Sequence, residues 1–240
     1  AIKEWDPDRN ALANEPIEND FIAVVQMPDY KERPGWNGTI ENSKDFIWNN
    51  GLRFLRHYQL TAIQKLQEAV GYGKDRFLFE MATGTGKTLV AAGVIRLFFR
   101  TENARRVLFL VDRLELEIQA WKAFRNNLKP DYTTFIYKEH ISDWRKADIV
   151  VTTIQSLMFD NKYRMLFTPT NFDLIISDES HRSISGNARA VFEYFHGYKL
   201  GLTATPRDYL KGVDLEKVRE NDPREIERRM LRDTYATFGC

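Results

Sequence analysis

Short apolar runs alternate with longer segments of helical periodicity from residue 52 onward. A run of about four to eight apolar residues between turn residues is typical of a buried strand, whereas apolar residues at every third or fourth position indicate an amphipathic helix. The runs predict strands at residues 76–81, 106–111, 133–137, 148–153, 172–177 and 198–205. The periodic segments predict helices at residues 55–70, 87–100 and 114–128. Because the strands are apolar almost throughout, we expect an α/β fold with a parallel sheet between helices.

The first 50 residues lack this alternation. They hold four of the eight prolines, and within them only the apolar run at residues 21–27 looks like a strand. In the last part of the chain, Asp222 is expected to cap a helix with Pro223 in its first turn. We interpret the chain as a linker or remnant of an upstream domain (1–50), one lobe (51–206) and a helical connection (207–240).

The composition describes a chain able to form a full core. Of 240 residues, 43% are hydrophobic and 29% charged, with a net charge of +1, which excludes the class of disordered chains that combine low hydrophobicity with high net charge. No apolar run reaches the roughly 18–20 residues that span a bilayer, and the first residues do not resemble a signal peptide. The single cysteine, Cys240, excludes an internal disulfide framework. We therefore expect a cytoplasmic location without membrane contact.

The small net charge hides an uneven distribution. Residues 1–50 hold 5 basic and 10 acidic residues, whereas residues 51–206 hold 22 basic and 16 acidic residues. The middle of the chain therefore carries a net charge of +6. A mildly basic region favours a polyanionic partner, although the excess alone is weak support.

The sequence MATGTGKT, residues 81–88, connects a predicted strand to a predicted helix. Glycines at 84 and 86 allow the backbone N–H groups to curl around phosphate oxygens, and the helix directs its positive end to the same place. Lys87 is expected to reach the β- and γ-phosphates of ATP and Thr88 to ligate Mg²⁺. The candidate nucleotide-binding residues here are Thr83, Gly84, Thr85, Gly86, Lys87 and Thr88.

A second motif, LIISDESH at residues 174–181, places two adjacent carboxylates after an apolar strand. Ligands of open α/β sheets bind at this end of the strands. Asp178 is expected to hold Mg²⁺, and Glu179 to orient and deprotonate the attacking water. His181 completes the set of candidate catalytic residues, with Lys87, Asp178 and Glu179.

Two further segments suit the same site. In GLTATP, residues 201–206, the hydroxyls of Thr203 and Thr205 are expected to bond to His181 and to sense the nucleotide state. Gln59 lies ahead of the first core strand, and its amide has the donor and acceptor that match the N6 and N7 edge of adenine.

Taken in order and spacing, these segments resemble superfamily 2 helicases of the DEAD/DEAH type. More narrowly, DIVVTTIQSL, DLIISDESHRSISGNARAVFEYF and KLGLTATPRDYL are similar to the motor (R) subunit of type I restriction-modification enzymes. The resemblance covers residues 52–240 and implies a RecA-like ATP-binding motor lobe, the first of two. It implies an ATP-dependent translocase on double-stranded DNA that works with methyltransferase and specificity subunits. The positions that match DNA-contacting segments of the family are Arg113, Thr152, Thr153, Gln155 and Ser156.

Two parts of the family pattern are missing from these residues. The second lobe, with an arginine that accelerates hydrolysis by about 10³–10⁵-fold in related enzymes, is expected beyond Cys240, so this piece alone should hydrolyse ATP poorly. The acidic-x-Lys triplets at residues 29–31 and 160–162 do not sit on a strand that suits a metal-dependent nuclease, so we expect no nuclease site here.

Other function classes stay open. A nucleotide switch or small-molecule kinase is disfavoured because DESH is followed by the TAT strand, and a purely DNA-docking module has no use for the intact ATP-site residues. Among DNA motors, the alternative is a superfamily 2 repair or type III restriction ATPase.

Overall fold

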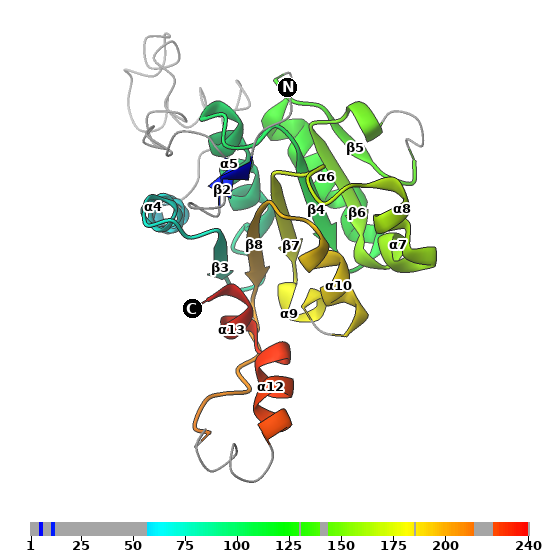
Figure 1. Ribbon diagram of the computed structural model, residues 1–240. Coiled ribbons are helices and arrows are strands. Elements are labelled where there is room, and N and C mark those ends of the chain that lie inside the picture. The colour runs from blue at the N-terminus through cyan, green and yellow to red at the C-terminus, as the bar shows by residue number, and fades with distance from the viewer. Residues whose placement is uncertain are drawn as a thin grey trace.

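A six-stranded sheet forms the centre of the molecule (Figure 1). The computed structural model describes residues 5–6, 11–12, 57–129, 131–139, 144–184, 186–213 and 223–239. The strands are β3 (Arg76–Glu80), β4 (Val107–Val111), β5 (Thr134–Ile136), β6 (Ile149–Thr153), β7 (Leu174–Asp178) and β8 (Tyr198–Thr203). All neighbouring strands are parallel, in the order β3-β8-β7-β4-β6-β5. The predicted α/β class with a parallel sheet between helices is confirmed, and every strand of this sheet overlaps a predicted apolar run.

Two short strands near the start of the chain form a separate antiparallel pair. β1 (Trp5–Asp6) pairs with β2 (Ala11–Leu12). The strand predicted at residues 21–27 and the helix cap predicted at Asp222 lie outside the described residues.

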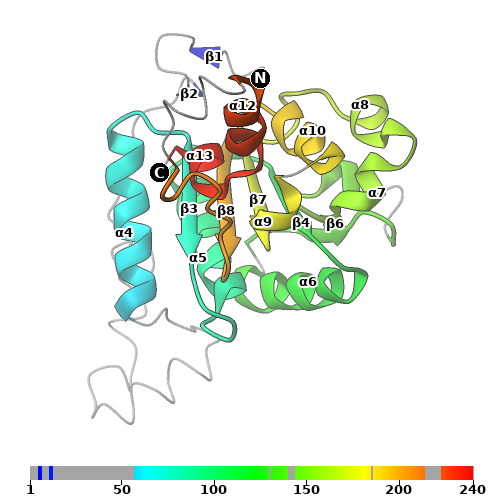
Figure 2. The same cartoon turned by 90° about the horizontal axis from the view of Figure 1, so that it is seen from below.

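Helices cover both faces of the sheet (Figure 2). One face carries α4 (His57–Gly71), α5 (Lys87–Arg100) and α6 (Leu114–Leu128). The other face carries η1 (Trp144–Lys146), α7 (Ile154–Met158), η2 (Phe159–Asn161), α8 (Lys162–Leu166), α9 (Ser180–Ser183), α10 (Asn187–Tyr194) and α13 (Thr234–Phe238). No helix in the described ranges is long and apolar enough to cross a membrane.

The central strand β4 shows why the apolar runs are continuous. Val107, Phe109 and Val111 pack into the core under α5 and α6, whereas Leu108 and Leu110 pack into the core on the opposite face. All five are at most 1% exposed. Since successive strand residues point to opposite faces, a strand buried on both faces must be apolar at every position.

The carboxyl ends of the strands form one edge of the sheet. Glu80 of β3 pairs with Thr203 of β8, and Val111 of β4 pairs with Thr153 of β6. The turns that follow β3, β4, β6, β7 and β8 therefore lie along this edge. The motifs singled out in the sequence occupy these turns, so the topology gathers them on one side of the molecule.

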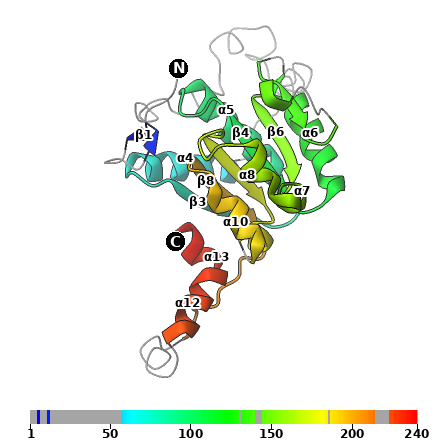
Figure 3. The same cartoon turned by 45° about the vertical axis from the view of Figure 1, so that its right-hand side comes forward.

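The chain after β8 returns to the sheet through two helices. Figure 3 shows α13 in red next to the sheet and α12 (Pro223–Arg232) in orange-red, projecting away from it. The ring of Phe238 lies so close to Gly201 of β8 that a side-chain Cβ at 201 would come within 2.5 Å of it. Asp233 caps α13 by accepting the N–H of Ala236 at 2.8 Å, and its other oxygen accepts the N–H of Tyr209 at 2.7 Å. The segment leading away from β8 is thus fastened to the lobe at two points.

Candidate functional site

The glycine-rich loop between β3 and α5 has the backbone shape of a phosphate cradle. Gly84 and Gly86 adopt φ angles of +80° and +84°, in the left-handed region that favours glycine. Gly86 directly precedes α5, so the amino end of that helix opens onto the loop. A Cβ at Gly86 would come within 2.8 Å of Gln59 Nε2. The loop therefore has both a curled backbone and a helix dipole to stabilise an anion.

Two residues of α4 hold this loop from the side. Gln59 is 2% exposed, and its Nε2 donates to the carbonyl of Thr85 at 2.7 Å. The hydroxyl of Tyr58 donates to the same carbonyl at 2.8 Å, and Thr85 Oγ1 donates to the carbonyl of Ala82 at 2.6 Å. Gln59 thus lies at the predicted nucleotide site with its amide nitrogen committed to the loop. Tyr58 was missed, and its adjacency to Gln59 was the available signal.

The two remaining loop positions differ in exposure. Thr83 is exposed at the turn, whereas Thr88 is half-buried in the first turn of α5. Thr88 directly follows Lys87, so its hydroxyl belongs to the same end of the helix that faces the loop.

The acidic pair follows β7 and lies against Lys87. Lys87 Nζ is 3.2 Å from Glu179 Oε1, and the lysine side chain is only 10% exposed. Glu179 has a φ of +49°, an uncommon conformation for a residue with a side chain. This turn lets its N–H donate to Asp178 Oδ1 at 3.0 Å. Backbone strain at a residue of this kind is common at functional sites.

Burial shifts the proton affinity of the carboxylate beside this turn. Desolvation raises the pKa of Asp178, the charge of Glu179 raises it further, and Lys87 and the N–H of Glu179 oppose the rise. A half-buried carboxylate that is costly to ionise is a good partner for a cation, because the cation offsets the desolvation cost. Asp178 and Thr88 supply hard oxygen donors of the type that Mg²⁺ prefers.

His181 connects the acidic turn to β8. Its Nδ1 is 2.8 Å from Thr203 Oγ1 and 3.5 Å from Glu179 Oε2. Burial lowers the pKa of His181, and the charge of Glu179 opposes that effect. Thr203 is fully buried, its Oγ1 accepts the N–H of Thr205 at 3.1 Å, and its carbonyl accepts the N–H of Met81 at 2.8 Å. Thr203 therefore contacts the acidic turn after β7 and the start of the glycine-rich loop, while Thr205 is exposed and bonds to Thr203 only through its backbone N–H.

The positions that match DNA-contacting segments divide into two groups. Arg113 and Gln155 are exposed after β4 and β6. Thr152, Thr153 and Ser156 are buried, at 0%, 3% and 6% exposure. Thr153 caps α7 by accepting the N–H of Ser156, and the two hydroxyls lie 2.5 Å apart. The buried hydroxyls shape the turn, and only the first group presents side chains to solvent.

A buried glutamate joins the two segments and was missed in the sequence. Glu117 of α6 is 4% exposed, and its Oε1 accepts the N–H of Thr153 at 2.6 Å. Burial raises the pKa of Glu117, and the hydrogen bond from Thr153 opposes the rise. The available signal was its position, because Glu117 lies in register with the buried Ala120, Phe124 and Leu128 of the same helix.

Comparison with known proteins identifies the family to which the chain belongs. Residues 53–208 match the family described as "Type III restriction enzyme, res subunit", over more than half of the chain. The chain belongs to this restriction-enzyme family.

Relatives of this family member include R subunits of type I enzymes. The chain is 34% identical over 173 residues to the type I restriction enzyme EcoAI endonuclease subunit of Escherichia coli, covering 69% of the chain and 21% of that relative. It is 31% identical over 177 residues to the EcoKI endonuclease subunit of E. coli strain K12, covering 63% of the chain and 15% of that relative. The resemblance to type I R subunits and to superfamily 2 is confirmed. The chain spans about a fifth of the EcoAI relative.

One further relative is named as a helicase. The chain is 32% identical over 159 residues to a Schizosaccharomyces pombe protein whose name describes a mitochondrial ATP-dependent helicase, irc3, covering 63% of the chain and 26% of that relative. The domain is therefore a superfamily 2 helicase-like ATPase domain of the restriction-enzyme R-subunit family.

Solved structures share its fold. The SWI2/SNF2 ATPase core of Sulfolobus solfataricus, in complex with dsDNA, matches with a TM-score of 0.54 and 20% identity, covering 64% of this chain and 32% of that one. The Type ISP restriction-modification enzyme LlaBIII, bound to DNA, matches with a TM-score of 0.51 and 23% identity, covering 64% and 13%. At these identities the likeness establishes the RecA-like fold of this restriction-family domain.

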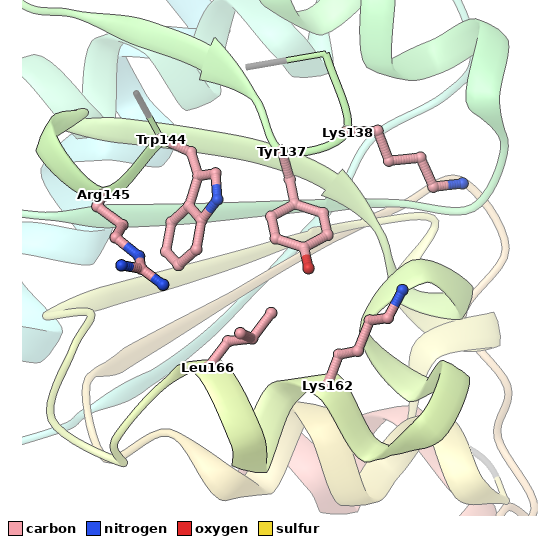
Figure 4. A pocket seen from close by; sticks show the side chains of 6 residues that line it. All are labelled: Tyr137, Lys138, Trp144, Arg145, Lys162 and Leu166. Carbon is pink, nitrogen blue, oxygen red and sulfur yellow. The ribbon is translucent and has the colours of Figure 1, made fainter. Parts of the chain in front are cut away.

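A pocket beside the edge strand β5 was not predicted from the sequence. It has a volume of about 330 Å³, and its lining begins at Tyr137, directly after β5, the edge strand farthest from β3 in the sheet order. Figure 4 shows two aromatic rings and a leucine around the cavity, with three basic side chains beside them. The lining residues are Tyr137, Lys138, Trp144, Arg145, Lys162 and Leu166. Its distance in the strand order from the phosphate loop separates it from the nucleotide site.

Proposed function

We propose that this chain is the first motor lobe of a type I restriction R subunit. In this proposal residues 51–206 bind Mg-ATP and duplex DNA, residues 207–240 lead towards a second RecA-like lobe, and residues 1–50 connect to an upstream domain. The two lobes together convert ATP hydrolysis into movement along double-stranded DNA. The methyltransferase and specificity subunits of the complex are the expected protein partners.

The contact that carries the proposal is the 3.2 Å approach of Lys87 Nζ to Glu179 Oε1. It brings the predicted phosphate-binding cation and the predicted general base to the same point of the strand edge. The backbone N–H groups of the loop and Lys87 bind the phosphates in this scheme, with Thr88 and Asp178 as the residues that would hold Mg²⁺. Mg²⁺ bound there supplies positive charge that offsets the charge of the phosphate oxygens.

Glu179 then acts as the general base. A phosphate that binds Lys87 competes with Glu179 for the ammonium group and frees the carboxylate to take a proton from the attacking water. His181, in contact with both Glu179 and Thr203, orients the base and links it to β8. The contacts among Lys87, Glu179, His181 and Thr203 support these roles, and the second lobe is expected to complete the site.

Duplex DNA is the proposed track. Arg113 and Gln155 are exposed at the same strand edge, and contacts to phosphates fix position without reading sequence. Two structural neighbours, the SWI2/SNF2 ATPase core and LlaBIII, are bound to DNA in their structures, which supports this choice of partner. A superfamily 2 repair helicase or type III restriction ATPase is the second candidate, favoured by the family description and by the helicase relative.

The deciding experiment is the ATPase rate of the full-length subunit that contains this lobe, assembled with its partner subunits. We compare no DNA, single strands and long duplex, each beside Glu179→Gln. Strong stimulation by long duplex, absent in the variant, is expected. A rate indifferent to DNA contradicts the motor proposal, and displacement of a labelled strand from a short duplex favours the helicase candidate.

A further inference from the structure

An ion pair joins the turn after β4 to the catalytic turn after β7. Arg182 Nη1 lies 2.6 Å from Asp112 Oδ2. β4 and β7 are neighbours in the sheet, so residues that are far apart in the chain meet at the strand edge. Arg182 follows His181 directly, and Asp112 precedes Arg113 directly. The ion pair therefore stands between the proposed ATP chemistry and the proposed DNA contact.

The same carboxylate oxygen also faces the candidate DNA-binding arginine. Arg113 Nε is 3.7 Å from Asp112 Oδ2. The side chain of Asp112 is 16% exposed, whereas those of Arg182 and Arg113 are 47% and 67% exposed. One partly buried acidic oxygen is thus shared by two cations, one fixed to the catalytic turn and the other able to reach solvent.

Arg182 is tightly connected to the catalytic base. Its backbone N–H donates to the carbonyl of Glu179 at 2.9 Å, within the single turn of α9. His181, between them in sequence, has its ring against Thr203. A change in the position of Arg182 is therefore transmitted through about one helical turn to Glu179.

We propose that Arg182 is a positioning residue that couples DNA contact at Arg113 to the geometry of Glu179. A DNA phosphate that draws Arg113 away from Asp112 leaves Arg182 as the partner of that carboxylate in the described part of the chain. The Asp112–Arg182 pair then tightens and fixes the turn that carries the general base. This inference rests on the function proposed above and adds to it the route by which DNA stimulates ATP hydrolysis.

Because the Asp112–Arg182 ion pair is partly exposed, its role in coupling can be tested without unfolding the lobe. Partly exposed ion pairs contribute little to stability, because solvent screens them and long side chains lose entropy when they pair. Loss of Arg182 should therefore leave the lobe folded. Its effect should appear in the coupling between two ligands, which is a difference between affinities or rates rather than a stability.

The test uses the full-length subunit with its partner subunits and compares Arg182→Gln with wild type. We measure the ATPase rate without DNA, the rate with saturating long duplex, and duplex affinity with and without a non-hydrolysable ATP analogue. We expect Arg182→Gln to keep the DNA-free rate and each separate affinity within about twofold and to lower DNA stimulation by roughly 5- to 20-fold, a coupling of ordinary size. The effect of the analogue on duplex affinity should shrink as well, because the same contact couples the two binding sites.

Four further variants test whether the effect is specific to the Asp112–Arg182 contact. Arg182→Lys keeps the charge and should recover most of the stimulation. Asp112→Asn should reproduce the loss, and the double variant with Arg182→Gln should be no worse than either single one, because both remove the same interaction. Arg105→Gln removes an exposed arginine two residues before β4, at the opposite end of that strand from Asp112, and should behave as wild type.

Full DNA stimulation in Arg182→Gln overturns the inference while leaving the motor proposal intact. An equal fall in the DNA-free and DNA-stimulated rates also overturns it, since that result describes damage to the ATP site. A wild-type enzyme without DNA stimulation overturns both proposals, and the wild-type measurement alone identifies that case.

Discussion

The proposed nucleotide end and the proposed DNA end of this lobe use polar residues in opposite ways. At the nucleotide end, side chains point toward one another: Lys87 meets Glu179, and His181 meets Thr203. At the proposed DNA end, three of the five candidate residues, Thr152, Thr153 and Ser156, are buried, whereas Arg113 and Gln155 are exposed. Chemistry on a phosphate needs particular side chains at fixed distances, whereas holding a uniform backbone needs a shaped turn and a few exposed donors.

The largest effect is expected from replacing the proposed general base at the nucleotide end. Glu179→Gln should keep ATP affinity and lower turnover by about 10²–10⁴-fold, because the amide cannot accept the proton from the attacking water. Single-turnover hydrolysis and nucleotide binding on the same preparation separate the two quantities. Unchanged turnover would assign the base to another residue.

The next largest effect is expected from removing Lys87, the cation that contacts Glu179. Lys87→Ala should weaken ATP binding by roughly 10- to 150-fold, the size of a charged hydrogen bond. Isothermal titration calorimetry gives the affinity directly. Lys74→Ala, an exposed lysine ahead of β3, serves as the control and should bind ATP normally. Near-normal affinity in Lys87→Ala would contradict the phosphate-loop assignment.

A third prediction concerns the buried hydrogen bond between Thr153 and Glu117 at the proposed DNA end. Glu117→Ala leaves the N–H of Thr153 without its acceptor and should lower the free energy of unfolding by about 1–3 kcal/mol. Glu117→Gln keeps an acceptor without a buried charge and should be close to wild type in denaturant titrations. Equal loss in both variants would show that the charge of Glu117, rather than its acceptor, stabilises the turn.

The pH dependence of the same residue follows from its raised pKa. A carboxylate that binds its proton more tightly in the folded state contributes stability at low pH and loses it as the pH rises through the raised pKa. The difference in stability between Glu117→Gln and wild type should therefore grow in favour of the variant as the pH rises above the ordinary pKa of a glutamate. A stability difference that does not change with pH would show that burial does not shift the pKa of Glu117.

The smallest effect sharpens the division at the DNA end. Arg113→Gln should weaken duplex binding a few-fold and reduce the slope of log affinity against log salt by about one. Thr152→Val, which removes a buried hydroxyl, should leave that slope unchanged. Fluorescence anisotropy across a salt series measures both. An equal change of the salt slope in both variants would contradict the division into exposed DNA-contacting residues and buried residues that shape the turn.

The fold could be predicted from the sequence because its strands are buried on both faces. In a chain of this composition, a continuous apolar run such as the one around Phe109 is typical of a strand that lies between two layers of helices. The phosphate loop could also be predicted from the sequence, because its glycines and Lys87 lie close together in the chain. The geometry of these parts is local, so the order of residues determines it.

The contacts that were missed join segments distant in sequence. Glu117 reaches Thr153, and Arg182 reaches Asp112, because β6 and β7 lie on either side of β4. Strand order depends on how the whole chain packs, so no local pattern could pair these residues. A threonine at a strand end, such as Thr152, is also compatible with either burial or exposure, and only the packed structure decides between them.

The docking of α13 has a mechanical consequence. Phe238 fills the space over Gly201 inside β8, and the carbonyl of Thr237 accepts from Arg76 at 3.1 Å, at the first residue of β3. The segment that leaves β8 at its carboxyl end is therefore braced against the middle of that strand and against its neighbour. Because β8 is paired on both sides, we expect a pull on α13 to load the hydrogen bonds to β3 and β7 together rather than one after another from the strand end.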